Sequence, residues 1–270
     1  MMVSAHNQKH LDKLGVLKCD WAIVNLEDGV NDKALARKML FDNFHQTKLQ
    51  FANLKTVVRV NPLDDVGIED IAIANQLAPN AIRVAKIKSQ EDVRKALQLI
   101  HKDIEVHLSV ETKEAFEQLS KLKIDSRVTT VYLGILDLFE SLGLPQNLIT
   151  LDNPTVNYIL SKFLIDSKIA GFYPVGLTFQ DYKDTQTFQK WCDKLKTMGY
   201  TATSAISPTQ VEIINETFST NKEQIDKAFY IKEVFEKMQS KGISGFSDEK
   251  YGFIDEPIYK DALLVLKYFN

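Results

Sequence analysis

The sequence lacks several features that define common protein classes. It contains only two cysteines, Cys19 and Cys192, which are far apart and form no zinc-type spacing. They exclude a disulfide-built fold and are expected to be reduced, buried side chains. No apolar run approaches the roughly 20 residues needed to span a bilayer. The first residues also lack the basic start and apolar core of a secretion signal, so we expect a cytoplasmic protein.

A strong charge imbalance and a glycine-rich phosphate loop are also missing. The net charge of −3 over 270 residues and the isoelectric point of about 6.0 give no electrostatic basis for binding nucleic acid or a membrane surface. Without a glycine-rich loop after the first strands, a dinucleotide-binding Rossmann fold is disfavoured. A hydrophobic content of 44% is enough for the core of one large α/β domain.

Short runs of branched apolar residues alternate with amphipathic stretches along the first 220 residues. The runs have the composition of buried strands, and the stretches between them have helical periodicity. The predicted strands cover residues 3–5, 21–26, 56–60, 81–87, 105–110, 128–133, 172–175 and 201–206. The predicted helices cover residues 9–17, 33–44, 68–76, 90–100, 113–121, 154–167, 182–198 and a segment that begins at Pro208. Eight strands alternating with eight helices predict an α/β fold, a (β/α)8 TIM barrel over residues 1–220.

Residues 221–270 are expected to form a C-terminal helical extension of the same domain. Two further helices are predicted, over 223–238 and 258–269, the first of them capped by Thr220 and Glu223. The stretch between them, 241–253, contains glycine and serine. A loop followed by a trailing helix beyond the barrel is suited to act as a lid or a subunit contact.

Charged side chains follow the predicted strands at the end where barrel enzymes carry their active sites. The residues at these strand ends are Glu27, Asp28, Arg59, Lys86, Glu111 and Asp137. Strand alternation supports one common cluster, because Arg59 points the same way as Val57, and Glu111 the same way as His107. The sequence therefore predicts polar groups inside the mouth of the barrel.

Each of these residues also has a purely structural interpretation. Glu111 precedes a helix whose dipole favours an acid, and Asp137 could cap the segment that follows it. Arg59 could form a structural ion pair with Glu27, and Lys86 could reach solvent. We favour a functional cluster because all of these groups fall at one end of the sheet.

The chemistry of the cluster suits a hard divalent cation. Mg²⁺, or Mn²⁺ in its place, binds one or two protein carboxylates and keeps water or substrate oxygens on its other positions. Imidazole and thiolate are absent from the cluster, which disfavours zinc and copper. Beside a fixed guanidinium, such a metal can stabilise an enolate formed when a carbon–carbon bond breaks. Of the histidines, His6 follows the first strand and is a candidate for substrate contact, whereas His107 lies deeper and is expected to be a core side chain.

Seven short motifs occur in order along almost the whole chain. They are Asn25-Leu-Glu-Asp-Gly-Val30, Val58-Arg-Val-Asn61, Ala85-Lys-Ile87 with Glu91-Asp-Val93, Val110-Glu-Thr112, Gly134-Ile-Leu-Asp-Leu138 with Leu142-Gly143, Ser207-Pro-Thr-Gln-Val211 with Ile214-Asn215 and Phe218, and Gly252-Phe-Ile-Asp-Glu-Pro257. Together they resemble the citrate lyase β-subunit-like branch of the HpcH/HpaI aldolase superfamily.

The resemblance implies a TIM barrel that acts as a Mg²⁺-dependent carbon–carbon lyase on citryl, malyl or citramalyl thioesters, and a homo-oligomer, either trimer or hexamer. It assigns metal ligation to Glu111 and Asp137 and substrate recognition to Arg59, with Lys86 and His6 as further substrate contacts. It gives Glu27 and Asp28 a role in holding metal-bound water. It also implies that Asp255, in the C-terminal lid and often in a neighbour's site, acts as an acid.

The chain departs from the family pattern at several positions. The family usually has Asp at Asn25 and a Pro-Lys pair where this chain has Ala85 and Lys86. The lysine and histidine that the family carries around strand eight are missing from residues 202–208. Lost cations weaken the case for a CoA thioester. Two alternatives therefore stay open: a CoA-independent 2-keto acid aldolase, and a catalytically degenerate barrel that serves as a binding or scaffold subunit.

Overall fold

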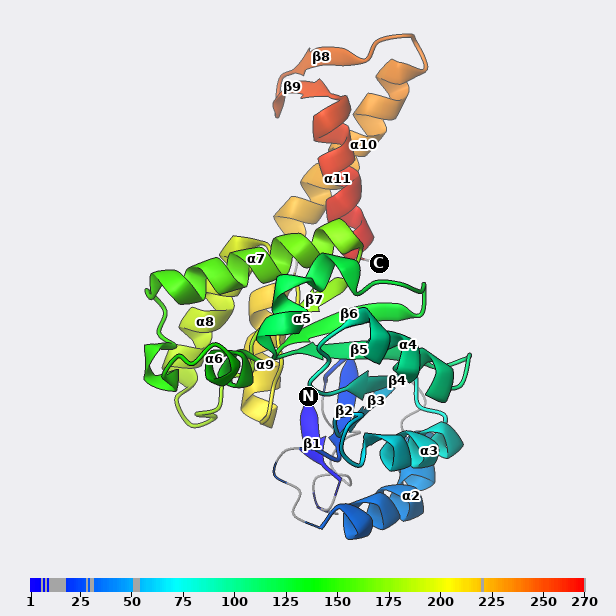
Figure 1. Cartoon of the computed structure of the whole chain (residues 1–270). Coiled ribbons are helices and arrows are strands. Elements are labelled where there is room, and N and C mark those ends of the chain that lie inside the picture. Colours follow the sequence, from blue (N-terminus) through cyan, green and yellow to red (C-terminus); the bar gives the residue numbers. More distant parts are fainter. Residues whose placement is uncertain are drawn as a thin grey trace. The chain divides into compact units, whose positions relative to one another are not determined.

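Seven parallel strands form one sheet and follow one another in chain order (Figure 1). The computed structural model describes residues 1–5, 7, 9, 18–27, 29, 32–50, 54–219 and 221–269. The strands are β1 (Met2–Ser4), β2 (Trp21–Asn25), β3 (Lys55–Val60), β4 (Ala81–Val84), β5 (Glu105–Val110), β6 (Val128–Leu133) and β7 (Tyr173–Val175). Each pairs with the next, as expected when every connection crosses over through a helix. The predicted parallel α/β architecture is confirmed for these seven strands.

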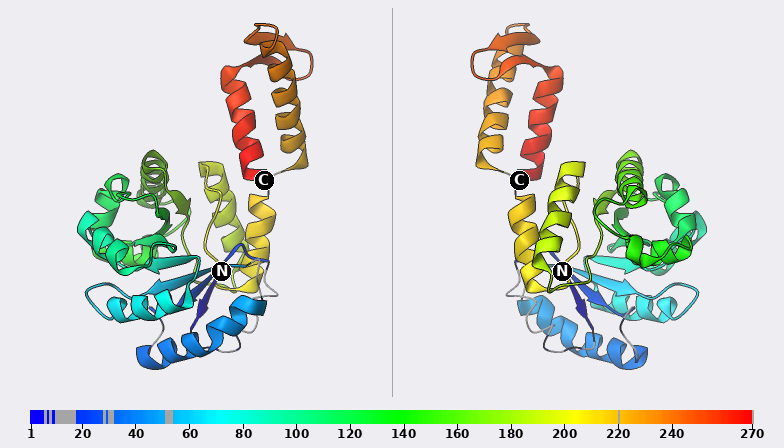
Figure 2. Two further views of the ribbon diagram at one scale, coloured as in Figure 1. Left: turned by 90° about the vertical axis from the view of Figure 1, so that its right-hand side faces the viewer. Right: turned by 90° about the vertical axis from the view of Figure 1, so that its left-hand side faces the viewer.

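The helices cover the outer face of this curved sheet (Figure 2). They are α2 (Lys33–Gln50), α3 (Gly67–Leu77), α4 (Gln90–Leu99), α5 (Lys113–Glu117), α6 (Ile135–Ser141), α7 (Pro154–Ala170), α8 (Thr185–Met198) and α9 (Pro208–Phe218), with 3-10 turns η2 (Leu119–Lys121) and η3 (Gln146–Leu148). A capping box of Ser89 and Asp92 begins α4, and Ser207 accepts a hydrogen bond from the Gln210 N–H at the start of α9. The helix predicted over 9–17 lies outside the described residues.

Strand alternation separates two sets of side chains. The outward set belongs to the main core and packs against the helices; it includes Val24, Val58, Ile82, Leu108 and Val131. The inward set contains a smaller apolar cluster made of Ile23, Val57, Ala81, Tyr132 and Val175. The same inward face carries polar residues in register across neighbouring strands, and these are Asn25, Arg59, Arg83 and His107. The polar interior therefore follows directly from the two-residue period of a strand.

An eighth strand was predicted over 201–206, but this segment does not form a regular strand. This segment forms a single parallel bridge, between Thr178 and Ser204. Its carbonyls nevertheless accept hydrogen bonds on both sides, since Ala202 accepts from Gly176 and Ala205 accepts from Met2. Residues 202–205 thus lie between the end of β7 and the start of β1 without the continuous ladder of a strand. The fold is consistent with a TIM-barrel type in which an irregular segment takes the place of the last strand.

The chain divides into two compact units, Met1–Phe218 and Ser219–Asn270. The second unit contains α10 (Lys222–Gln239), the antiparallel hairpin of β8 (Gly245–Asp248) and β9 (Gly252–Asp255), and α11 (Glu256–Phe269). It has its own apolar cluster, in which Phe235 stacks on Tyr259 with ring centroids 4.5 Å apart. That the two units form one domain, with boundaries at 220 and 221, stays a prediction.

Two details of the second unit differ from expectation, the cap of α10 and the segment between the helices. The predicted cap Thr220 lies outside the described residues, and Asn221 caps α10 by accepting a hydrogen bond from the Glu223 N–H at 2.9 Å. The stretch predicted as a loop, 241–253, instead contains most of the β8–β9 hairpin. Among the helices that the structure describes, none is long and apolar enough to cross a membrane.

Candidate functional site

A cavity of about 310 Å³ opens at the carboxyl ends of the strands. It brings together residues from β2, β3, β4, β5 and the turn after β6, as the strand ends of a barrel should. Its charged and amide-bearing lining residues are Asn25, Arg59, Arg83, Glu111, Asp137 and Gln180. Three residues predicted from the sequence, Arg59, Glu111 and Asp137, therefore share one cavity.

Glu111 is the most firmly held of these side chains. It is only 2% exposed, and its Oε1 accepts a 2.7 Å hydrogen bond from the backbone N–H of Lys86. Its Oε2 lies 3.5 Å from Nη2 of Arg59. Lys86 adopts φ = +50°, an uncommon conformation for a residue with a side chain. The chain thus bends sharply after β4, and the bend directs a backbone donor at the carboxylate.

Gly134 provides the space that Glu111 occupies. A Cβ placed on Gly134 would lie 2.6 Å from both the Cβ and the Oε2 of Glu111, closer than such atoms can approach. Gly134 immediately follows β6 and precedes α6. Glycine is therefore required here by the close approach of the neighbouring strand end.

Arg59 forms ion pairs with two carboxylates. Its Nη2 lies 2.7 Å from Oε2 of Glu27 and 3.5 Å from Oε2 of Glu111, and all three side chains are at least 95% buried. The structural interpretation of Arg59, an ion pair with Glu27, is thus part of its role. The second ion pair of Arg59, with Glu111, links β3 to that carboxylate and fixes its orientation.

Asp137 lies in the first turn of α6 and remains open to the cavity. Its nearest charged partner is Nζ of Lys86, 3.7 Å away, and the two side chains are 30% and 41% exposed. Gly134 occupies the N-cap position of α6, so Asp137 does not cap the helix. Thr112 caps α5, and the carboxylate of Glu111 contacts the Lys86 N–H and Arg59.

Arg83 is a site residue that the sequence analysis did not select. It lies inside the barrel beside Arg59 in the strand register, is 5% exposed and lines the same cavity. Its Nε donates to Oγ of Ser109 at 2.7 Å, and its guanidinium stacks on Tyr132 at 4.1 Å. Burial and the neighbouring Arg59 lower the pKa of Arg83 to about 10, so it stays charged at neutral pH. A lone cation at an inward position of an apolar strand was the available signal.

The carboxylate set fits Mg²⁺ better than a metal held entirely by protein. Across the part of the chain that the structure describes, no three His, Cys, Asp or Glu side chains gather as a metal-binding group. Glu111 and Asp137, which line the same cavity, would supply the one or two carboxylates that Mg²⁺ typically takes. The remaining positions would be filled by water or substrate oxygens.

The other predicted site residues do not line this cavity or are not among the described residues. Asp28 and His6 are outside the described residues. Asp255 ends β9 in the second unit, where its Oδ1 accepts a hydrogen bond from the Ile258 N–H at 3.2 Å. Nζ of Lys86 lies 3.7 Å from Asp137, and the side chain is partly exposed, in keeping with the solvent-reaching interpretation as well.

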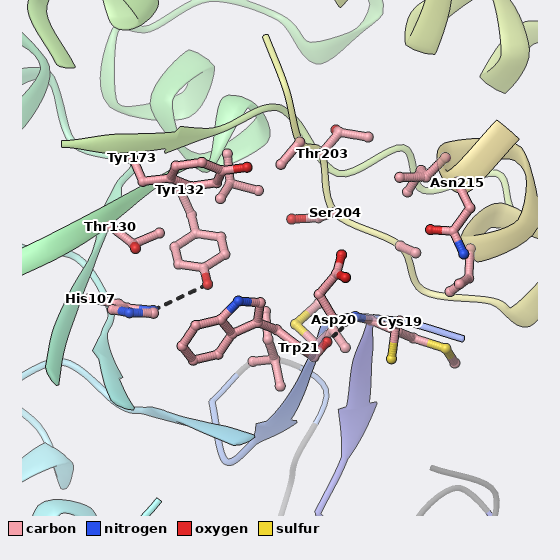
Figure 3. Close-up of a pocket in the computed structure, with 18 residues that line it drawn as sticks. Cys19, Asp20, Trp21, His107, Thr130, Tyr132, Tyr173, Thr203, Ser204 and Asn215 are labelled. Carbon is pink, nitrogen blue, oxygen red and sulfur yellow. Dashed lines mark hydrogen bonds between the residues drawn. The ribbon is translucent and has the colours of Figure 1, made fainter. Parts of the chain in front are cut away.

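A second cavity, of about 200 Å³, lies at the amino-terminal end of the same strands (Figure 3). It is lined mainly by apolar and aromatic side chains, with Trp21, His107, Tyr132 and Tyr173 among them. His107 is 1% exposed; its Nδ1 lies 3.2 Å from the Tyr132 hydroxyl and its Nε2 3.3 Å from Glu105. His107 is therefore a satisfied core histidine, as expected. Among the described residues that line this cavity, Asp20 is the one carboxylate, whereas Glu111 and Asp137 share the cavity at the other end.

The fold and the position of the carboxylates match a known family. The sequence pattern of the HpcH/HpaI aldolase/citrate lyase family matches residues 1–208. The chain belongs to this family. Within it, the citrate lyase β-subunit-like branch is the one that its relatives represent.

Three family members illustrate the relationship. Mitochondrial citramalyl-CoA lyase of Mus musculus is 25% identical over 97% of this chain and 82% of its own length. A citrate lyase from Burkholderia xenovorans superposes with a TM-score of 0.84 at 19% identity, over 98% of this chain and 90% of that one. The protein CitE from Mycobacterium tuberculosis, solved with magnesium, acetoacetate and coenzyme A, has a TM-score of 0.76 at 20% identity, over 99% and 96% of the two chains. These likenesses extend over both units of the chain.

Proposed function

We propose that this protein is a Mg²⁺-dependent carbon–carbon lyase that cleaves a small hydroxy-acid derivative of the citryl, malyl or citramalyl type. The observation that carries the proposal is the convergence of Glu111, Asp137 and Arg59 on one cavity at the carboxyl ends of the strands. Membership of the HpcH/HpaI family supports it, as does the magnesium bound by the related CitE. Within this proposal residues 202–205 take the place of the eighth barrel strand.

Glu111 and Asp137 would hold the metal, with Mn²⁺ able to replace Mg²⁺. When bound, the cation neutralises the negative charge that develops on an enolate oxygen and orients the substrate. Arg59 holds Glu111 in place and offers positive charge to the substrate beside it. Glu27 fixes Arg59, and Asp28 joins it in orienting metal-bound water. Lys86 keeps Asp137 in the cavity through its ammonium group, and His6 is proposed as a further substrate contact.

The reaction is a retro-Claisen or retro-aldol cleavage. A base removes the proton of the substrate hydroxyl, a carbonyl forms at that carbon, and the bond to the neighbouring carbon breaks. The electron pair passes to that neighbouring carbon, whose enolate is then protonated by an acid. We assign the acid to Asp255, acting in its own site or in that of a neighbouring copy in a trimer or hexamer. A cytoplasmic location belongs to the same proposal.

A second candidate is a CoA-independent aldolase that acts on free 2-keto acids. The observation that favours it lies in residues 202–208, which contain neither the lysine nor the histidine of the family pattern. A phosphorylated carrier normally binds to cationic side chains. A barrel without catalysis, serving as a binding subunit, is a third possibility that the arrangement of Glu111 and Asp137 disfavours.

Purified protein incubated with Mg²⁺ and citryl-, malyl- or citramalyl-CoA, and separately with free hydroxy and keto acids, distinguishes these candidates. We expect cleavage of at least one compound, measured as keto-acid release, and its loss on chelation of the metal. Turnover of a thioester rejects the second and third candidates together. Turnover of free acids alone supports the aldolase, and no turnover of any compound contradicts both enzymatic proposals.

A further inference from the structure

Arg83 is a buried guanidinium whose terminal nitrogens contact no hydrogen-bond acceptor among the described residues. Its Nε is committed to Ser109, and its flat face is supported by Tyr132. Neither terminal nitrogen forms a hydrogen bond or ion pair with any residue that the structure describes. A buried guanidinium normally satisfies its donors, because leaving them unpaired costs free energy. Since Arg83 lines the carboxyl-end cavity, these donors are available to a ligand there.

Arg59 differs from Arg83 although the two are register partners on neighbouring strands. Arg59 is engaged by the carboxylates of Glu27 and Glu111, at 2.7 Å and 3.5 Å. Arg83 has no carboxylate partner among the described residues; its hydrogen bond goes to a neutral hydroxyl. Arg59 is thus directly ion-paired with two described carboxylates, whereas Arg83 interacts with Glu111 and Glu27 only at longer range.

The charge of the cavity points in the same direction. Of the described residues, four with charged side chains line it: Arg59, Arg83, Glu111 and Asp137. Glu27 is ion-paired with Arg59 and Lys86 with Asp137. Together these are three cations and three carboxylates, whose charges sum to zero, so a bound divalent cation would leave two positive charges. A ligand with two negative charges would balance them. A volume of about 310 Å³ accommodates a small acid of this kind.

We propose that Arg83 binds a carboxylate of the substrate in a two-pronged contact, and that the substrate accordingly carries two free carboxylates, one at the metal centre and one on Arg83. Among the thioesters of the proposed function, this selects the citryl type, because malyl and citramalyl thioesters keep only one free carboxylate; among free acids it selects dicarboxylates. This inference rests on the proposed function, because it places the first carboxylate at the metal. Ser109 and Tyr132 position the guanidinium by fixing its Nε and its plane, which leaves the remaining donors in a fork suited to a carboxylate.

Calorimetric titration with L-malate and L-lactate in the presence of Mg²⁺ tests it. The two hydroxy acids differ by one carboxylate and do not require turnover. We expect wild-type protein to bind malate about tenfold or more tightly than lactate. Arg83→Met should remove that preference by weakening malate alone, and Arg83→Lys should restore part of it, because the charge returns without the fork. Arg94→Met, at an exposed arginine of α4, is the matched control and should change neither affinity.

The outcomes separate this inference from the proposed function. Mg²⁺ affinity is measured first in every variant, and its absence in wild type rejects the proposed function itself. Normal Mg²⁺ binding with equal affinities for malate and lactate, with no binding of either, or with a malate preference that survives in both Arg83 variants overturns only the role of Arg83. Arg83→Lys keeps the test valid if Arg83→Met does not fold, because a structural role would weaken both ligands equally.

Discussion

The two ends of the barrel differ in how their charged groups are satisfied, and β5 passes through both. At its first residue Glu105 pairs with His107 and Thr129, and His107 in turn contacts Tyr132, so each group has a partner within the protein. Just beyond its last residue Glu111 meets Arg59, the Lys86 backbone and an open cavity. The amino-terminal end is therefore built for stability, and the carboxyl end has donors and acceptors left for a ligand.

This difference teaches that the side chains lining a cavity, and not the presence of a cavity, indicate chemistry. The amino-terminal cavity is apolar, aromatic and well formed, yet its histidine is buried and satisfied. Burial lowers the pKa of His107, and the hydrogen bond to Glu105 opposes that effect only in part. A neutral imidazole whose two ring nitrogens both have hydrogen-bond partners has a structural role. The carboxyl end instead combines two carboxylates with two guanidinium groups.

The largest difference is expected between single substitutions of the two glutamates at opposite ends of β5, Glu105 at its first residue and Glu111 just after its last. Glu111→Gln should lower lyase activity by roughly 10³-fold, because a neutral amide is a poor ligand for Mg²⁺ and a weaker partner for Arg59. Glu105→Gln should leave activity within about twofold, since Glu105 serves only His107 and Thr129. Steady-state kinetics on both variants checks this. Equal losses in the two would show that the ends are not functionally distinct.

A smaller effect is expected at the glycine beside Glu111. Gly134→Ala should displace the carboxylate and lower activity by about 10²-fold, with weaker Mg²⁺ binding. Gly143→Ala is the matched control, because Gly143 has φ = +70° and open space around it. Its cost should be about 1 kcal/mol of stability, with Mg²⁺ binding unchanged. Calorimetry with Mg²⁺ and thermal melting of both variants separate the two effects, and unchanged Mg²⁺ affinity in Gly134→Ala would contradict the close packing.

The smallest effect concerns pH at the amino-terminal end. The folded protein holds the pKa of His107 below its usual value, so the unfolded chain binds the proton more readily. This contribution to stability is complete above pH 6.5 and is lost as the pH falls below that value. His107→Gln should therefore show a shallower loss of unfolding free energy between pH 7 and 5 than wild type. Denaturant titrations at several pH values measure it, and parallel slopes would argue against a buried neutral imidazole.

Much of the fold could be predicted because strand and helix periods are local properties. The seven strands from Met2–Ser4 to Tyr173–Val175 are short branched or apolar runs, and their alternation alone specified the inward face. Residues 201–206 failed as a strand because Thr-Ala-Thr-Ser lacks a continuous apolar run, and hydroxyls compete for the backbone. The helix predicted over 113–121 ends at Glu117 and continues only as a 3-10 turn.

The site was predictable only where a charged side chain ends a strand. Glu111, Asp137, Arg59 and Glu27 stand at such positions, and alternation placed Arg59 and Glu111 in the barrel mouth. The donor from the Lys86 backbone could not be predicted, because a positive φ at a lysine depends on packing around it. Arg83 was missed because the predicted strand 81–87 placed it in mid-strand. The strand β4 ends at Val84, so Arg83 is the penultimate residue of its strand, as Arg59 is in β3.

The most direct test of the account is the position of a bound divalent cation. Crystals soaked in Mn²⁺ should give one anomalous-difference peak at the carboxyl end, about 2.1 Å from carboxylate oxygens of Glu111 and Asp137. The same soak of Glu111→Gln should remove it. A peak in the amino-terminal cavity beside Glu105 and His107, or no peak next to Glu111 in wild-type crystals, would contradict the assignment of metal chemistry to the carboxyl end.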